Sequence, residues 1–215
     1  MTPEPLQPTP ENVQRVAECI RDGGVVAAPS DTNVALTLDP WHAEAVDRAY
    51  EIKSRPPEKP LTLFVRDPDE WRRFGHHSDP DAVTALTEAF WPGPLNIVLE
   101  ATEYVHDDRL TMDGTVSIGC LSNPVWRDLT SHLDGPVAMT SANVSGTVAD
   151  DELVTVDTAL DHVGDAVDHV LAGEPQSTTR ASTILDLTGD GPEIIRRGDI
   201  TREEIDAALG DASDA

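Results

Sequence analysis

The two lysines of this chain lie close together, on either side of an arginine. The stretch reads Lys53-Ser54-Arg55-Pro56-Pro57-Glu58-Lys59-Pro60-Leu61, and every other basic residue of the chain is an arginine. An ammonium is a compact point charge suited to phosphate oxygens, and a guanidinium can grip phosphate or carboxylate in two places. We therefore expect Lys53 and Arg55 to bind phosphate. The alternative is that these cations complement the dipole at the end of a helix.

A second polar cluster follows the short apolar segment Val137–Met139. It reads Thr140-Ser141-Ala142-Asn143-Val144-Ser145-Gly146. Small hydroxyl residues at the end of a strand leave backbone N–H groups accessible, which suits the capture of an anion or a nucleotide. An ordinary turn is the alternative, because Ser, Asn and Gly favour turns. Pro29-Ser30-Asp31-Thr32 follows another short strand and has the same character.

The standard phosphate and metal motifs are absent from the sequence. It contains no GxxxxGK[ST] loop, no GxGxxG fingerprint, no HExxH and no paired-cysteine zinc spacing. Any phosphate chemistry must therefore use a different cradle, and no carboxylate ligand for a metal stands out.

The charge is the most unusual bulk property of the 215-residue chain, with 40 acidic against 15 basic residues and a net charge of −25. Such a surface resembles that of proteins from salt-loving organisms, because molar salt shortens the Debye length to about 3 Å and screens the repulsion. We expect the protein to lose stability at low ionic strength. A melting temperature that is independent of salt would contradict this. The acidity also argues against non-specific nucleic-acid binding over the whole surface, although a local basic groove could bind RNA.

Two further features indicate a cytoplasmic protein. No stretch approaches the roughly 18 apolar residues that span a bilayer. The only cysteines, Cys19 and Cys120, lie in apolar or mixed surroundings and are predicted to be buried free thiols.

Periodicity and turn residues predict one α/β domain over residues 6–200, then a short helix and acidic tail over 201–215. The expected fold is a twisted open mixed sheet flanked by helices. Strands are predicted at Val25–Ala28, Asn33–Leu38, Leu61–Val65, Leu95–Glu100, Thr115–Cys120, Val137–Met139, Ala166–Leu171, Thr183–Leu187 and Glu193–Arg196. Helices are predicted from Pro10 to Gly23–Gly24, from Asp39 or Pro40 to about Arg55, and over Ala82–Phe90, Pro124–His132 and Glu203–Leu209. Trp91–Pro92–Gly93–Pro94 is expected to form a rigid turn, and Asp150–Asp165 an acidic, partly helical surface segment.

Several segments, in this order, resemble the YrdC-like family, the threonylcarbamoyl-AMP synthases, from about Val13 to Ile200. Six stretches in this order and spacing are specific for the family, although no single one is. They are residues 23–32, Lys53-Ser54-Arg55-Pro56 to Leu61, Trp91-Pro92-Gly93-Pro94-Leu95, residues 140–146, residues 182–189 and Ile195-Arg196-Arg197-Gly198.

The resemblance implies a central concave, positively charged cavity in the sheet. It implies synthesis of threonylcarbamoyl-AMP from L-threonine, bicarbonate and ATP, with release of pyrophosphate. The product would feed threonylcarbamoyladenosine formation on tRNA by a partner complex. Double-stranded RNA binding is also attributed to the family.

Residue roles carried over from the resemblance fall into two groups. Lys53 and Arg55 would serve catalysis and bind ATP together with Ser141, Ala142, Asn143 and Arg196. Thr32, Thr140 and Ser182 would line the threonine pocket. Attack on the α-phosphate builds charge on phosphoryl oxygens, which positioned cations stabilise. A divalent ion, expected to be Mg²⁺, would bridge the phosphates.

The chain departs from the family pattern on the small-substrate side. Val34 and Ala35 stand where the family usually has an aromatic residue and a glycine, and Gly119 stands where it usually has an arginine. A lost carboxylate–guanidinium pair is worth about 1.5–3 kcal/mol. Arg109 or Arg180 could fill that gap.

These departures keep two alternatives to the synthase open. One is a nucleotide- or double-stranded-RNA-binding paralogue that lacks the synthesis. The other is a domain that acts on a different carbamoyl or acyl substrate.

Overall fold

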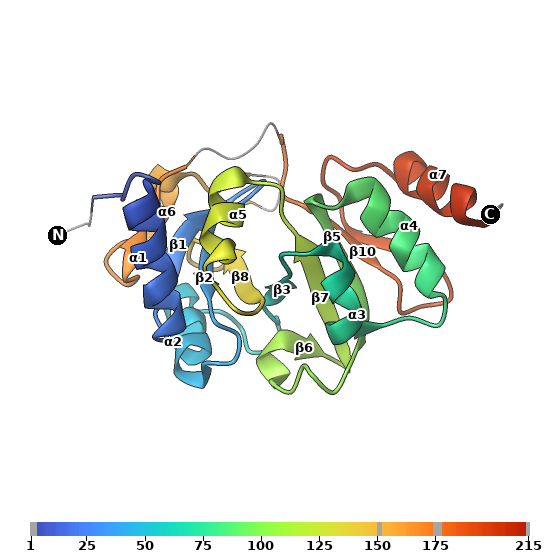
Figure 1. Ribbon diagram of the computed structural model, residues 1–215, viewed down its shortest axis with the longest axis horizontal. Helices are drawn as coiled ribbons and strands as arrows, with labels where there is room; N and C mark the ends of the chain where they lie inside the picture. The colour runs from blue at the N-terminus through green and yellow to red at the C-terminus, as the bar shows by residue number, and fades with distance from the viewer. Residues whose placement is uncertain (1–3, 150–151, 174–177, 214–215) are drawn as a thin grey trace.

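The computed structural model describes residues 4–149, 152–173 and 178–213, which form a mixed α/β fold (Figure 1). Strands occupy β1 (Val26–Pro29), β2 (Val34–Leu38), β3 (Thr62–Phe64), β4 (Gly75–His76), β5 (Gly93–Ala101), β6 (Thr111–Met112), β7 (Thr115–Cys120), β8 (Val137–Ser141), β9 (His169–Val170), β10 (Thr183–Asp186) and β11 (Glu193–Arg196). The α-helices are α1 (Pro10–Arg21), α2 (Ala43–Lys53), α3 (Trp71–Phe74), α4 (Pro80–Phe90), α5 (Pro124–Ser131), α6 (Val156–Val163) and α7 (Arg202–Ser213). Two 3₁₀ turns are η1 (Pro68–Glu70) and η2 (Asp108–Leu110).

The strands join in one sheet with the order β11-β10-β5-β7-β3-β8-β2-β1-β9, and β4 and β6 pair with β5 and β7. The pairs β1–β9, β3–β7 and β5–β10 are parallel, and the other pairs are antiparallel. The predicted mixed sheet flanked by helices is thus confirmed. Figure 1 shows α1, α2 and α6 around the β1–β2 end of the molecule and α4 with α7 around the β5–β10 end.

Helix α1 begins and ends where the sequence predicted. The Thr9 side chain accepts a hydrogen bond from Asn12 N, and Pro10 occupies the first turn, where a missing N–H costs nothing. Apolar residues on one face of α1 are buried, among them Val16 and Ile20.

Helix α2 begins at Ala43, later than the predicted Asp39 or Pro40, because the Asp39 carboxylate accepts from Trp41 N and holds a turn there. The helix ends at Lys53, followed by Ser54 in the left-handed conformation with φ of 47°. Lys53 lies one turn after Ala49 on the buried face of α2 and is itself buried.

Some short elements and boundaries differ from the predictions. Gly93 and Pro94 belong to β5 rather than to a separate turn, and β8 extends to Ser141, two residues beyond the predicted end. The elements α3, β4 and β6 were not predicted, because spans of two to four residues are too short to show a period. Cys120 is buried, as expected, but Cys19 is only partly buried; both are free.

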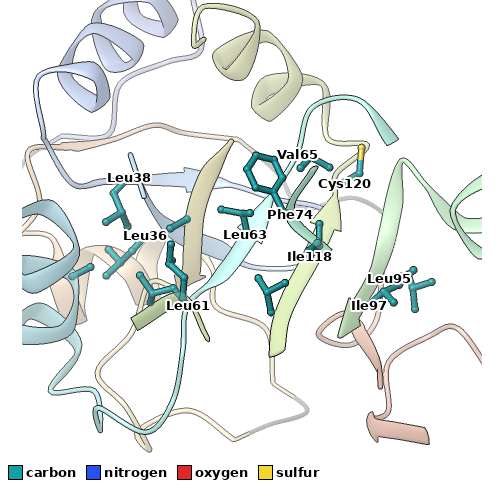
Figure 2. Close-up of a cluster of buried hydrophobic side chains, with 14 of the residues drawn as sticks. Leu36, Leu38, Leu61, Leu63, Val65, Phe74, Leu95, Ile97, Ile118 and Cys120 are labelled. Atoms are coloured by element: carbon teal, nitrogen blue, oxygen red, sulfur yellow. The ribbon is translucent and has the colours of Figure 1, made fainter. Parts of the chain in front are cut away.

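Buried apolar side chains pack on both faces of the sheet. The larger core includes Leu36 of β2, Leu63 of β3, Ile97 of β5 and Ile118 of β7 (Figure 2). The smaller core lies under α1 and α5 and includes Ala35, Phe64 and Met139. Successive strand residues point to opposite faces, so Leu63 and Phe64 contribute to different cores.

The C-terminal helix α7 packs against α4, and its Ile205 is fully buried in the larger core. The proposed division at residue 200 stays a prediction. No helix in the described ranges is long and apolar enough to span a membrane.

Candidate functional site

A cavity of about 660 Å³ opens over the face of the sheet that carries the smaller core. Its walls include alternate residues of several strands: Thr62 and Phe64 of β3, Asn96 and Val98 of β5, Thr115 and Ser117 of β7, and Ile184 and Asp186 of β10. Alternation places such residues on one face, while their neighbours Leu63, Ile97, Val116 and Leu185 lie in the larger core. The volume is in the range of small-molecule sites.

Lys53 is the most deeply buried charged residue of the cavity, with 2% of its surface exposed. Its Nζ donates to the carbonyl oxygens of Ser141, at 2.5 Å, and Asn143, at 2.7 Å. The Asn143 Oδ1 lies 3.3 Å from the same nitrogen, and Ser145 N donates to the Lys53 carbonyl. We call Lys53, Ser141 and Asn143 the lysine cluster. Lys53 thereby fastens the segment after β8 to the end of α2.

Burial, reinforced by the nearby charge of Arg55, lowers the pKa of Lys53 from 10.5 to about 7. Lys53 is buried rather than exposed at the helix end, so it does not act as a simple surface partner of the helix dipole. Two of the three hydrogens of its ammonium are directed at carbonyl oxygens, and its role in phosphate binding stays a prediction.

Arg55 lines the cavity beside this cluster and is held in place from three sides. Its guanidinium donates to the Lys59 and Pro60 carbonyl oxygens at 2.8 and 2.7 Å, and to Thr140 Oγ1 at 3.2 Å. Arg55 therefore contacts the segment after β8 directly, through Thr140. Lys59 also lines the cavity, and its side chain is exposed.

The segment after β8 divides between cavity and core. Thr140, Ser141 and Asn143 line the cavity. Ala142 does not: its side chain is fully buried in the larger core, and its N–H donates to Val34 O at 2.9 Å. Neither group of Ala142 is therefore directed at a ligand, in contrast to the prediction.

The loop between β1 and β2 contributes Ser30 and Thr32 to the cavity. Asp31 faces elsewhere, and its carboxylate accepts from the backbone N–H groups of Ser122 and Asn123. Burial raises the pKa of Asp31, although these hydrogen bonds oppose the shift. The aspartate thus fixes the loop that carries Thr32.

Ser182, directly before β10, and Arg196, the last residue of β11, line the cavity. The Ser182 carbonyl accepts from Arg196 Nε at 2.8 Å, which orients the guanidinium. The structure therefore places Thr32, Lys53, Arg55, Thr140, Ser141, Asn143, Ser182 and Arg196 in the walls of one cavity.

The cavity is much less acidic than the chain as a whole. Its walls hold four basic residues, Lys53, Arg55, Lys59 and Arg196, against three acidic ones, Glu58, Glu152 and Asp186. The whole chain has 15 basic and 40 acidic residues. Positive charge gathered in a concave site attracts anionic ligands.

Sequence reasoning missed the group formed by Phe64, Asn96 and Gly119, which we call the Asn96 cluster. Phe64 and Asn96 line the cavity, and the register aligns both with Gly119 on the strand between them. A Cβ on Gly119 would lie 2.6 Å from Phe64 Cε1 and 2.7 Å from Asn96 Oδ1. A polar residue inside an apolar strand, at Asn96, was the signal that could have found it.

Arg109 and Arg180, the candidates to replace the arginine absent at position 119, do not line the cavity. Arg109 is paired with Asp107 and Asp47 and donates to Ala43 O. Arg180 is exposed and lies near Asp199. Of the other two departures, Ala35 lines the cavity and Val34 is buried in the larger core.

The described residues contain no group of three or more His, Cys, Asp or Glu side chains that could hold a metal ion. Mg²⁺ is commonly bound through one or two carboxylates together with substrate phosphates.

The fold and the cavity define an α/β protein with a mixed sheet and a cationic small-ligand site. A family model described as telomere recombination, that of the Sua5, YciO and YrdC proteins, matches residues 18–198. The chain therefore belongs to the Sua5/YciO/YrdC family.

Individual relatives are threonylcarbamoyl-AMP synthases. That of Bacillus subtilis is 30% identical over 203 residues, which cover 92% of this chain and 56% of that protein. That of Vibrio vulnificus is 30% identical over 191 residues, which cover 87% of this chain and 98% of that protein. The crystal structure of Pyrococcus abyssi Sua5 complexed with L-threonine matches with a TM-score of 0.85 at 26% identity, covering 94% of this chain and 58% of that one. The chain thus spans a little over half of two of these relatives and nearly all of the third.

Proposed function

We propose that the protein is a threonylcarbamoyl-AMP synthase that makes threonylcarbamoyl-AMP from L-threonine, bicarbonate and ATP and releases pyrophosphate. The observation that carries this proposal is the single cavity in which Lys53, Arg55 and Arg196 meet the polar residues at the ends of β1 and β8. Relatives with this name match most of the chain at 30% identity.

The ATP phosphates bind at the end of the cavity that Arg55 and Lys59 line. Charge that develops on the phosphoryl oxygens during attack on the α-phosphate needs positioned cations. Arg55 is held by three hydrogen bonds and so is arranged in advance to receive a phosphate. Lys59 adds an ammonium at the exposed rim of the cavity.

Lys53 acts as a positioning residue in this proposal. Its ammonium holds the carbonyl groups of Ser141 and Asn143, which sets the shape of the segment that faces the nucleotide. Ser141, Asn143 and Arg196 then contact the nucleotide.

Thr32, Thr140 and Ser182 line the threonine pocket in this proposal. Thr140 receives a hydrogen bond from Arg55, so it lies at the border between the phosphate and amino-acid ends. Bicarbonate would bind at the same border, since threonine and ATP must both reach it. Mg²⁺ enters with ATP as part of the substrate, and Glu58, Glu152 and Asp186 are the cavity carboxylates available to it.

The product would be passed to a partner complex that modifies tRNA, which places the reaction in the cytoplasm. The test is to incubate the protein with ATP, bicarbonate and labelled L-threonine in high salt and to measure pyrophosphate. We expect pyrophosphate release that requires threonine and bicarbonate. If ATP binds but no threonine-dependent pyrophosphate appears, the synthase proposal fails. A shift of duplex RNA under the same salt would then favour the RNA-binding paralogue.

A further inference from the structure

Tyr50 of α2 lies outside the cavity walls, but its hydroxyl reaches the segment that supplies three of the four basic residues of the cavity. Its Oη lies 2.8 Å from the Lys59 carbonyl oxygen and 3.0 Å from the Arg109 carbonyl oxygen. The ring is half-buried and packs against the larger core. Burial raises the pKa of the Tyr50 phenol, although the charge of Arg55 opposes the rise. The phenol therefore keeps its proton and donates it to these carbonyl oxygens.

Arg55 is attached to the same tyrosine and to the same carbonyl group. Its Nε donates to the Lys59 carbonyl oxygen at 2.8 Å, and its backbone N–H donates to the Tyr50 carbonyl oxygen at 2.9 Å. A carbonyl oxygen has two lone pairs, so the Tyr50 hydroxyl and the Arg55 guanidinium can both be bound to the Lys59 oxygen. The phenol and the guanidinium therefore meet at one acceptor.

The turn between Arg55 and Lys59 has little other support. Lys59 N donates to the Pro56 carbonyl oxygen at 3.1 Å, and residues 57–59 are exposed. A segment with few buried contacts opens locally at a low cost in free energy. The hydroxyl of Tyr50 attaches the end of this turn to α2, which is anchored in the core.

We propose that Tyr50 is a positioning residue whose hydroxyl holds the Lys59 carbonyl, and through it the Arg55 guanidinium, in the arrangement that receives the ATP phosphates. This inference rests on the proposed function and adds a residue to its phosphate end. A cation that is fixed before the ligand arrives loses less conformational freedom on binding. The hydroxyl thus raises the affinity for ATP without touching ATP.

The experiment measures the Kd for ATP by isothermal titration in high salt. Tyr50→Phe keeps the ring in the core and removes only the hydroxyl. We expect the Kd of this variant to rise about 3- to 10-fold, the loss typical of one neutral hydrogen bond. The matched control is Tyr104→Phe, because Tyr104 is the other tyrosine of the chain, is exposed and lies outside the cavity walls. Its Kd should stay within about twofold of the wild type.

A double-mutant cycle distinguishes positioning of Arg55 from a general loss of structure. If the hydroxyl acts through the guanidinium, adding Tyr50→Phe to Arg55→Ala should change the Kd for ATP by less than about twofold. A merely structural hydroxyl would lower the affinity by the same factor in both backgrounds. Equal losses in the two backgrounds would therefore overturn the inference.

Pyrophosphate release separates this inference from the proposed function. If Tyr50→Phe weakens ATP only when Arg55 is present, the inference is supported even where the wild type releases no threonine-dependent pyrophosphate and the synthase proposal fails. If Tyr50→Phe binds ATP as tightly as the wild type does, the inference is wrong, while threonine-dependent pyrophosphate would still support the synthase. Wild-type protein that binds no ATP overturns both.

Discussion

The lysine cluster and the Asn96 cluster lie in the walls of one cavity and differ in how their polar atoms are satisfied. Lys53 already donates to carbonyl oxygens of the protein itself, whereas Asn96 Oδ1 has no partner in the described part of the chain. A satisfied buried donor holds the segment after β8 in place, whereas a buried acceptor without a partner costs stability. The difference teaches that the most buried cation of the cavity can be its scaffold, while a neutral residue in the same walls carries the unmet hydrogen-bonding capacity.

Replacing Lys53 with methionine should have the largest effect, and it should act first on stability. Two buried carbonyl groups lose their donor, so we expect the free energy of unfolding to fall by about 2–4 kcal/mol. Nucleotide binding should weaken with it, because the segment from Ser141 to Asn143 loses its support. Chemical denaturation in high salt measures the change. The matched control is Lys59→Met, which changes an exposed lysine of the same cavity and should leave stability unchanged. Equal losses of stability in both variants would show that Lys53 supports the fold no more than Lys59 does.

Arg55→Ala should act on binding more than on stability, because Arg55 is partly exposed and water can replace its contact with the carbonyl of the exposed Lys59. The variant loses the contact between the guanidinium and a phosphate, so its affinity for ATP should fall about 10- to 100-fold, which corresponds to about 1.5–3 kcal/mol. Isothermal titration with ATP measures this, and Arg72→Ala on α3, outside the cavity, is the control. If Arg55→Ala binds ATP as tightly as the wild type does, the phosphates do not bind at the segment from Lys53 to Lys59.

The pH dependence of stability should report the burial of Lys53 directly. Its folded-state pKa, about 7, lies below the unfolded value of 10.5. Between these values the unfolded state holds more protons, so stability must rise with pH. From pH 7 to 9 the rise should be about 2 kcal/mol. Denaturation curves across this range test it, and the rise specific to Lys53 should vanish in Lys53→Met. If the two proteins share one pH profile, Lys53 keeps its proton throughout.

The sequence predicted the larger elements and most of the cavity for physical reasons. Helix α1 and strand β7 show their periods over 12 and 6 residues, and both were placed within about one residue. Lys53 and Arg55 could be located because the chain almost never uses lysine, so the segment that holds both of its lysines is conspicuous. Recognition of the ordered segments then brought Thr32, Ser182 and Arg196 into one site.

What could not be predicted depends on register between distant strands. Asn96 and Gly119 meet only because β5 pairs with β7 at that level, and Phe64 joins them through β3. Lys53 points inward because it lies four residues after Ala49 on the buried face of α2, a position where an apolar residue would ordinarily be expected. Ala142 was misplaced because strand β8 continues to Ser141 and turns the next residue into the core.

Gly119→Ala should have a smaller effect than the changes above, and it tests the other half of the comparison. The added methyl would meet Phe64 and Asn96 at less than 3 Å, so the variant should lose about 1–2 kcal/mol of stability as both side chains shift. Gly135→Ala is the control, since nothing lies within 4 Å of its Cβ position. Equal stability of Gly119→Ala and Gly135→Ala would show that Phe64 and Asn96 do not pack closely over position 119.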